Sequence, residues 1–247
     1  MPLKYGKLPA RHDSRDLLYA SYAPELIRVP AVYKRQLHAF GDWQMLGNDQ
    51  YGDCVFAGAD HETMMWDKEG GHKATFSADT ALSDYAAVTG FDPVTGEGDN
   101  GTDVRTALGY RRKTGLADTE GKRHKLAGYV ALEVGNIAHV KEAIYLFGAV
   151  GLGFEVPASA QQQFADGQPW TVVPGQPIEG GHYVPAIGYG PRSVYVVTWG
   201  RTQEMSWQFF STYTDEAYGL LSAEFLRSGR SPAGFSLAQL KTDLRAL

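Results

Sequence analysis

The sequence contains one cysteine, Cys54, among 247 residues. A single thiol cannot form an intramolecular disulfide, and it excludes every metal site that needs two thiolates from one chain. There is also no run of about 18 apolar residues, the length that a membrane-spanning helix requires. The first residues, MPLKYGKLPARHDSRDLLYASY, lack the apolar centre of a secretory signal peptide. These absences predict no membrane partner, and a location in the cytoplasm or, by packaging, in a phage particle.

Clusters of positive charge are absent as well. The chain has 23 Lys and Arg against 28 Asp and Glu, a formal net charge of −5, and no basic run. Because nucleic-acid-binding proteins usually present a basic face, nucleic acid is not expected as a partner. The sequence shows no internal repeat, low-complexity tract or Pro/Ser-rich linker, which predicts a single domain over 1–247.

Residue patterns predict helices in the first half of the chain and strands in the second. Residues 1–40 form a polar, extended lead-in with prolines at 9, 24 and 30, followed by a helical region at about 41–130 and a strand-rich region at about 131–247. Helices are predicted from Cys54 onward, with Asp53 as N-cap, and at about 77–89, 102–114 and 137–147. The predicted strands are short, aromatic and β-branched: AVGLGFEV, HYVPAIGYG, SVYVVTWG and MSWQFFSTY. Helices followed by strands indicate an α+β fold with two lobes rather than an alternating βαβ sheet.

Cys54 is a candidate nucleophile because of its position. It lies in the first turn of a predicted helix, where the partial positive charge of the helix N-terminus favours a thiolate. The preceding loop, GDWQMLGNDQYGDC, is rich in glycine, which lets backbone amides approach a substrate oxygen. The alternative interpretation is a small buried hydrophobic residue, a common state of free cysteine.

Among the seven histidines, His182 is the best candidate for a base. His61 follows Cys54 by seven residues on the same predicted helix, which places it roughly 10 Å away, too far for proton transfer. His182 follows two glycines and opens a predicted strand, so that its ring can reach the edge of a cleft. The remaining histidines lie in polar stretches and are predicted to be surface groups: His12, His38, His72, His124 and His139.

Several motifs, in order along the chain, resemble those of papain-like cysteine peptidases of the bacterial and phage kind. His182 follows Cys54 by 128 residues, close to the spacing of about 130–150 in that family. LPARHDSRDLLYASY resembles the start of the mature domain, and LGNDQYGDCVFAGA resembles the loop and helix of the nucleophile. Similar matches are GTDVRTALGYRRKTGL, VKEAIYLFGAVGLGFEV, GGHYVPAIGYG and VVTWG.

The resemblance implies a two-lobed papain-like fold. A helical N-terminal lobe would carry the nucleophile helix, and an antiparallel β-sheet or barrel would form the C-terminal lobe. It further implies a cysteine-dependent hydrolase of amide or peptide bonds, with Cys54 as nucleophile and His182 as base. Such an enzyme works through a thiolate–imidazolium pair and an acyl-enzyme, acts on a peptide or protein, and needs no cofactor or metal.

Two positions depart from the family pattern. The family has a glutamine six residues before the nucleophile, whose amide helps to bind the oxyanion; here Asn48 offers a shorter donor, or is simply a turn residue. The family also has an asparagine that orients the histidine, two residues before a shielding tryptophan, and here that position is Val197. Thr198 could supply a hydroxyl, although strand alternation predicts that it faces away from Trp199 unless a bulge intervenes.

By the same resemblance, a substrate cleft lies between the lobes near residues 48–54, 98–101 and 180–183. Acidic residues near this cleft, Asp99, Asp103 and Glu179, predict a preference for basic side chains. Only about 40 residues precede the core, so no long inhibitory pro-segment is expected. The candidate substrate-binding residues are Gly52, Asp53, Gly181 and Trp199, whereas Trp207 is predicted to be a core aromatic.

Other functions stay open. A papain-like scaffold with little or no catalysis, kept for binding or for virion assembly, fits the two departures, since a fold does not fix a function. In that case Cys54 would react with electrophiles no faster than an ordinary exposed thiol. A metal site built from His182 and nearby carboxylates is a weaker alternative, because the sequence has no HExxH motif.

Overall fold

A computed structural model describes residues 3–14, 16–22, 27–222 and 224–225. Pro24 of the predicted lead-in and the part of the predicted strand-rich region beyond 225 lie outside these described residues. Within them, the mixed architecture expected from the sequence is confirmed, with helices preceding most of the strands.

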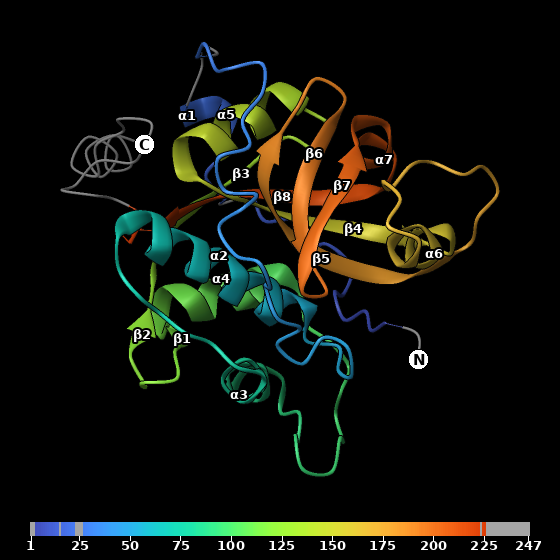
Figure 1. Cartoon of the computed structure of the whole chain (residues 1–247). Helices are drawn as coiled ribbons and strands as arrows, with labels where there is room; N and C mark the ends of the chain where they lie inside the picture. The colour runs from blue at the N-terminus through green and yellow to red at the C-terminus, as the bar shows by residue number, and fades with distance from the viewer. Residues whose placement is uncertain (1–2, 15, 23–26, 223, 226–247) are drawn as a thin grey trace.

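Six strands form one antiparallel sheet in the order β3-β8-β4-β5-β6-β7 (Figure 1). The register places His182 of β5 opposite Phe154 of β4, and the pairing continues back to Ile178. His182 therefore lies inside a strand and does not open it as predicted, because the two preceding glycines pair in the ladder as well. The strands are β3 (Leu126–Ala131), β4 (Val150–Pro157), β5 (Ile178–Tyr189), β6 (Ser193–Thr198), β7 (Arg201–Ser206) and β8 (Thr214–Ser222).

The predicted helices are confirmed to within a few residues. Polar side chains fix their starts: Ser77 and Thr80 form a reciprocal capping box, and the Asp103 and Asn136 side chains accept backbone N–H groups of the first turn. No helix in the described part of the chain is long and apolar enough to cross a membrane. The helices are α1 (Tyr19–Tyr22), α2 (Cys54–Gly70), α3 (Ala78–Thr89), α4 (Val104–Lys113), α5 (Ile137–Phe147), α6 (Ser159–Ala165) and α7 (Trp207–Tyr213), and a small pair is formed by β1 (Leu116–Ala117) and β2 (Arg123–His124).

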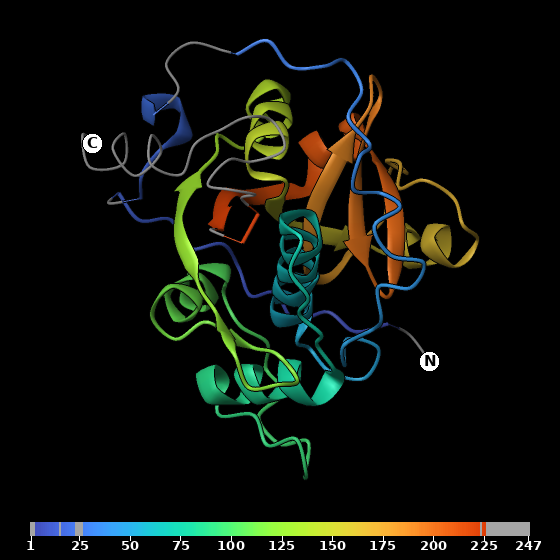
Figure 2. The same ribbon diagram turned by 60° about the vertical axis from the view of Figure 1, so that its left-hand side comes forward.

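Helix α2 lies between the sheet and helices α3 and α4 and is buried on almost every side (Figure 2). Its close approach to β5 depends on Gly58, where a Cβ atom would lie only 2.7 Å from Cδ1 of Tyr183. A buried polar network fixes the same contact: the Tyr183 hydroxyl donates to Glu62 Oε1 at 2.7 Å, and Arg111 Nη1 of α4 lies 2.7 Å from Glu62 Oε2. These contacts position the first turn of α2, which carries Cys54, beside β5.

One predicted strand is wrong. MSWQFFSTY divides into the end of β7 and the whole of helix α7. Its aromatic content is typical of a strand, but the Ser206 hydroxyl accepts the N–H of Phe209 at 3.1 Å and starts a helix. Phe209 and Phe210 are then buried in the core of the sheet, as is Trp207, which was expected there.

Two histidines predicted to be surface groups, His124 and His139, are buried. Polar neighbours in the sequence indicated exposure, but tertiary contacts cover both rings. His124 lies between two carboxylates, Asp118 and Glu224. His139 lies in the first turn of α5 with its ring against that of Tyr19.

Candidate active site

Cys54 is the first residue of α2 and is only 1% exposed. Asp53 precedes the helix as predicted, but its side chain makes no capping hydrogen bond. Burial raises the pKa of the Asp53 carboxyl well above its usual value, partly offset by the Asn48 side chain. The helix start therefore carries no capping carboxylate.

His182 is held by two neighbours on β6 and just beyond it. Its Nε2 lies 2.7 Å from the Thr198 hydroxyl oxygen, and its ring stacks on Trp199 with centroids 4.5 Å apart. Trp199 adopts a left-handed backbone conformation with φ of 42°. The strand ends at Thr198, so the alternation that predicted opposite orientations for these two side chains does not extend to Trp199. Val197 is buried and offers no acceptor, so Thr198 takes the place next to the imidazole.

Cys54 and His182 line one narrow pocket with a free volume of about 10 Å³. That volume is close to what a single water molecule needs. Nδ1 of His182 is buried and has no hydrogen-bond partner among the described residues. The other residues that line this pocket are Met45, Asn48, Ala57, Gly58, His61, Tyr183, Val197, Thr198 and Trp199.

Asn48 is buried in this pocket, near Cys54. Its Nδ2 donates to the Tyr51 carbonyl at 3.1 Å, which leaves its second N–H for another acceptor. His61 holds the same loop by a hydrogen bond, since its Nε2 lies 2.9 Å from the Trp43 carbonyl oxygen. Burial lowers the pKa of His61 to about 4, so it supports the loop as a neutral imidazole.

The acidic residues that were expected to favour basic substrates contact other groups of the protein. Asp99 accepts the backbone N–H of Gly52 at 3.0 Å and the hydroxyl of Tyr85 at 2.9 Å, which fixes the loop before Cys54. Asp103 caps α4. Glu179 faces the hydroxyl of Tyr5 at 3.5 Å. The carboxylates of Asp99 and Asp103 therefore do not support the predicted preference for basic side chains.

An N-terminal segment, residues 5–8 and here called the cover, packs against Cys54 and His182 through the backbone N–H of Gly6 and the ring of Tyr5. The N–H groups of Gly6 and Lys7 donate to the Gly181 carbonyl at 3.2 and 3.0 Å. On the other side, the N–H of Thr102 donates to the Gly6 carbonyl at 2.8 Å, and that of Leu8 to the Thr102 carbonyl at 3.0 Å. The cover thus bridges the helical part and the sheet above Cys54 and His182.

Side chains anchor the cover at both ends. The ring of Tyr5 lies 6.0 Å from that of His182 and 6.1 Å from that of Trp199, between centroids. Lys7 is buried and its Nζ lies 2.8 Å from Asp215 Oδ2 and 3.4 Å from Glu216 Oε1. No long inhibitory segment was expected from the sequence, yet these few residues pack against both Cys54 and His182. In the sequence around the cover, Gly6 is the residue that could have indicated a close backbone contact.

With the cover in place, both reactive groups are held neutral. Burial raises the pKa of the Cys54 thiol to about 12, although the backbone N–H groups of Tyr183 and Gly6 lower it. Burial alone lowers the pKa of His182 to about 3. The thiolate that the helix N-terminus was expected to favour is thus opposed by desolvation in the covered form.

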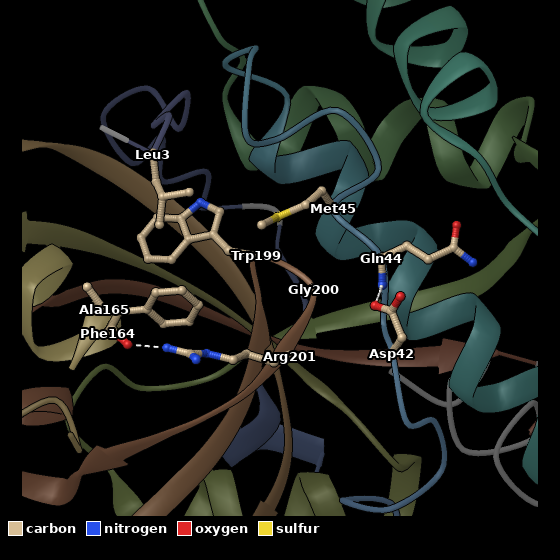
Figure 3. A pocket seen from close by; sticks show the side chains of 9 residues that line it. All are labelled: Leu3, Asp42, Gln44, Met45, Phe164, Ala165, Trp199, Gly200 and Arg201. Atoms are coloured by element: carbon tan, nitrogen blue, oxygen red, sulfur yellow. Dashed lines mark hydrogen bonds between the residues drawn. The ribbon is translucent and has the colours of Figure 1, made fainter. Parts of the chain in front are cut away.

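A wider pocket of about 670 Å³ lies on the other side of Trp199 (Figure 3). It shares Met45 and Trp199 with the narrow pocket, and Leu3 borders it from the N-terminal segment. Its lining includes the ring of Phe164 and the charged side chains of Asp42 and Arg201.

Comparison with known proteins shows the class of this fold. No protein-family model and no curated protein sequence matches the chain. Among solved structures, xylellain, a cysteine protease from Xylella fastidiosa, matches with a TM-score of 0.69 at 17% identity, over 90% of this chain and 97% of that one.

Two further structures agree. The Carica candamarcensis cysteine protease CMS1MS2, solved in complex with E-64, matches with a TM-score of 0.58 at 16% identity, over 78% of this chain and 99% of that one. ProCathepsin B S9 from Trypanosoma congolense matches with a TM-score of 0.61 at 12% identity, over 88% and 86% of the two chains. The fold is that of the papain-like cysteine proteases, as the sequence motifs predicted.

Proposed function

We propose that the chain is a cysteine-dependent hydrolase of amide or peptide bonds, in which Cys54 is the nucleophile and His182 the base. The observation that carries the proposal is their shared pocket, in which Nδ1 of His182 has no other partner among the described residues. Thr198 orients the ring through Nε2 in place of an asparagine. The fold supports the same reaction class.

The chemistry follows from this arrangement once the cover is displaced. With Nε2–H donated to the Thr198 hydroxyl, the Nδ1 lone pair accepts the proton of the Cys54 thiol. The thiolate attacks the substrate carbonyl carbon, and the oxyanion accepts hydrogen bonds from the Cys54 N–H and from Asn48 Nδ2. The His182 imidazolium then protonates the leaving amine as the C–N bond breaks. Water, losing a proton to His182, hydrolyses the thioester and restores the thiol.

We infer that a peptide or protein chain is the substrate and that it takes the position of the cover. Gly181 and Thr102 already pair through their backbones with Gly6, Lys7 and Leu8, so an extended chain can form the same kind of bonds there. The wider pocket beyond Trp199 has room for a further substrate side chain. These contacts support an extended substrate and do not require a basic residue in it.

A scaffold without catalysis is the second candidate, and one observation favours it. Both reactive groups are buried and neutral in the covered form, with the Cys54 pKa at about 12 and that of His182 at about 3. A binding protein would have no need to displace the cover. The two candidates differ in the reactivity of Cys54 in molecules whose cover has opened.

The deciding test is the rate of Cys54 alkylation by iodoacetamide against pH, in the natural sequence and in His182→Ala. The fraction of open molecules scales the rate, but the shape of the profile reports the thiolate of the open form. For an enzyme we expect reaction to persist below about pH 6 in the natural sequence and to be lost there in His182→Ala. A profile that follows an ordinary thiol pKa of about 8.5 in both proteins would support the scaffold.

Thr198→Val tests the orientation of the imidazole. Removing one neutral hydrogen bond of about 1 kcal/mol is expected to lower the alkylation rate at pH 6 by roughly fivefold, because Nε2 then has no partner to fix the tautomer. Thr198→Asn, which restores an acceptor, is expected to recover most of the rate. Thr212→Val is the matched control, since that hydroxyl bonds to the Gln208 carbonyl within α7. Equal rates in Thr198→Val and the natural sequence would exclude the orienting role.

A further inference from the structure

Three potential metal ligands from distant parts of the chain converge at the end of α2 that lies away from Cys54. Asp67 belongs to the last turns of α2, His124 ends β2, and Glu224 follows β8. One ligand atom from each lies within 4.8 Å of the others. In Figure 1 the end of β8 lies beside this end of α2, and a Cβ atom at Gly70 would be only 1.8 Å from the Glu224 carbonyl oxygen.

Asp67 provides an independent indication of a ligand. It is 1% exposed, and neither oxygen of its carboxylate has a hydrogen-bond partner among the described residues. Buried polar atoms in proteins nearly always have a partner, and a carboxylate without one is costly to desolvate. One of these oxygens nevertheless lies within 4.8 Å of ligand atoms of His124 and of a second carboxylate, Glu224. A cation would satisfy both acids.

His124 is oriented as a ligand. Its Nε2 lies 3.0 Å from Asp118 Oδ2, while its Nδ1 contacts Glu224 Oε1. Asp118 is itself fixed, because its Oδ1 accepts the backbone N–H groups of Glu120 at 3.0 Å and Lys122 at 2.8 Å. If Nε2–H donates to Asp118, the Nδ1 lone pair is directed toward Glu224. A carboxylate behind a histidine in this way is common in metal centres, where it sets the tautomer.

The charge balance also favours a cation. Three carboxylates, those of Asp67, Asp118 and Glu224, surround the imidazole. Apart from His124 itself, Lys122 is a basic neighbour of this group; its side chain is largely exposed and its Nζ lies 3.7 Å from Glu224 Oε1. Two further basic side chains lie at this end of α2: His72 is exposed, and Lys68 of the last turn donates to the Ala39 carbonyl. One imidazole nitrogen and carboxylate oxygens suit Zn²⁺ and related ions, whereas Ca²⁺ and Mg²⁺ prefer oxygen ligands alone.

We propose that Asp67, His124 and Glu224 bind a divalent transition-metal cation of the Zn²⁺ type, with water completing the coordination and Asp118 as a positioning residue. The site is separate from the reactive pair, because Asp67 lies thirteen residues beyond Cys54 on α2, about 20 Å along the helix axis. Its role is structural: the cation joins the segment after β8 to α2 and to the β1–β2 pair.

The test is calorimetric titration of the metal-free full chain with ZnCl₂, in a Cys54→Ala background so that the thiol cannot bind the metal. We expect one equivalent of Zn²⁺ per chain and a higher melting temperature on binding. Asp67→Asn and Glu224→Gln should each weaken binding by at least about tenfold, and Asp118→Asn by about 10–100-fold. Glu97→Gln, which alters an exposed loop carboxylate, is the matched control and should bind Zn²⁺ as its parent does.

Two results would overturn the proposal. One is no binding at millimolar Zn²⁺, and the other is binding of equal affinity in the parent, Asp67→Asn and Glu224→Gln. In either case the three acids and the histidine lie close together without forming a metal site. If Asp67→Asn does not fold, Glu224→Gln decides, because Glu224 is partly exposed. Co²⁺ in place of Zn²⁺ gives a second readout, since its visible spectrum reports nitrogen and oxygen ligands directly.

Discussion

Gly6→Ala is expected to raise the alkylation rate of Cys54 at neutral pH by roughly a thousandfold. A Cβ atom at Gly6 would lie 1.7 Å from the backbone oxygen of Gly52, and backbone cannot move aside cheaply. The cover must therefore leave its position, which exposes the thiol to water. The pKa of Cys54, now raised from 9.0 to about 12 by burial, would return toward its ordinary value, and three pKa units correspond to a thousandfold more thiolate.

Gly41→Ala is the control for this substitution, because a Cβ atom at Gly41 meets nothing within 4 Å. It makes the same chemical change without displacing the cover and should react like the natural sequence. Melting temperature and circular dichroism should show that both variants remain folded. A folded Gly6→Ala protein that reacts no faster than the Gly41→Ala protein would mean that the cover does not limit access to Cys54.

Arg111→Met is expected to lower the free energy of unfolding by about 3–5 kcal/mol at pH 7. Arg111 pairs with Glu62, and the side chains of both are almost fully buried. Removing the guanidinium leaves the Glu62 carboxyl with the Tyr183 hydroxyl as its remaining partner. Burial already raises the pKa of Glu62 despite Arg111 and Tyr183, so the carboxyl would take up a proton in the folded state. The loss should therefore increase as pH rises above the ordinary carboxyl pKa and shrink below it.

Urea unfolding measures this loss of stability, and two further variants show whether it comes from the unpaired charge. Arg35→Met breaks an ion pair to Glu69 in which the arginine side chain is 49% exposed, and it should cost no more than about 1 kcal/mol. The double variant Glu62→Gln/Arg111→Met removes both charges and should recover part of the lost stability. A double variant as unstable as Arg111→Met alone would attribute the loss to packing of the arginine stem.

The sequence was sufficient to locate the two groups on which the proposed chemistry rests. Cys54 was recognisable from its place between a glycine-rich loop and a helix, and His182 from its place after two glycines in a strand. Both signals are local, because helix starts and strands follow from neighbouring residues. The fold class followed from the order of such elements, and the similar solved structures confirm it. The single-domain assignment and the association with virions stay predictions.

Features that depend on the meeting of distant segments could not be predicted in this way. Thr198 and Trp199 both contact His182 because β6 ends at Thr198 and Trp199 takes a left-handed conformation, and nothing in VVTWG indicates that conformation. MSWQFFSTY has the composition of a strand, but the Ser206 cap starts a helix there. The cover was missed because its contacts are backbone hydrogen bonds to Gly181 and Thr102, which leave no side-chain pattern.

The cover is an intramolecular competitor of any substrate or inhibitor that binds at Cys54 and His182. Because residues 5–8 are tethered to the site against which they pack, their effective concentration stays constant at any dilution of the protein. The apparent affinity of any substrate or inhibitor is then weakened by the fraction of molecules that are open, about a hundredfold if one molecule in a hundred is open. Every ligand is weakened by the same factor, so a screen on the full chain should rank ligands correctly while understating all of their affinities.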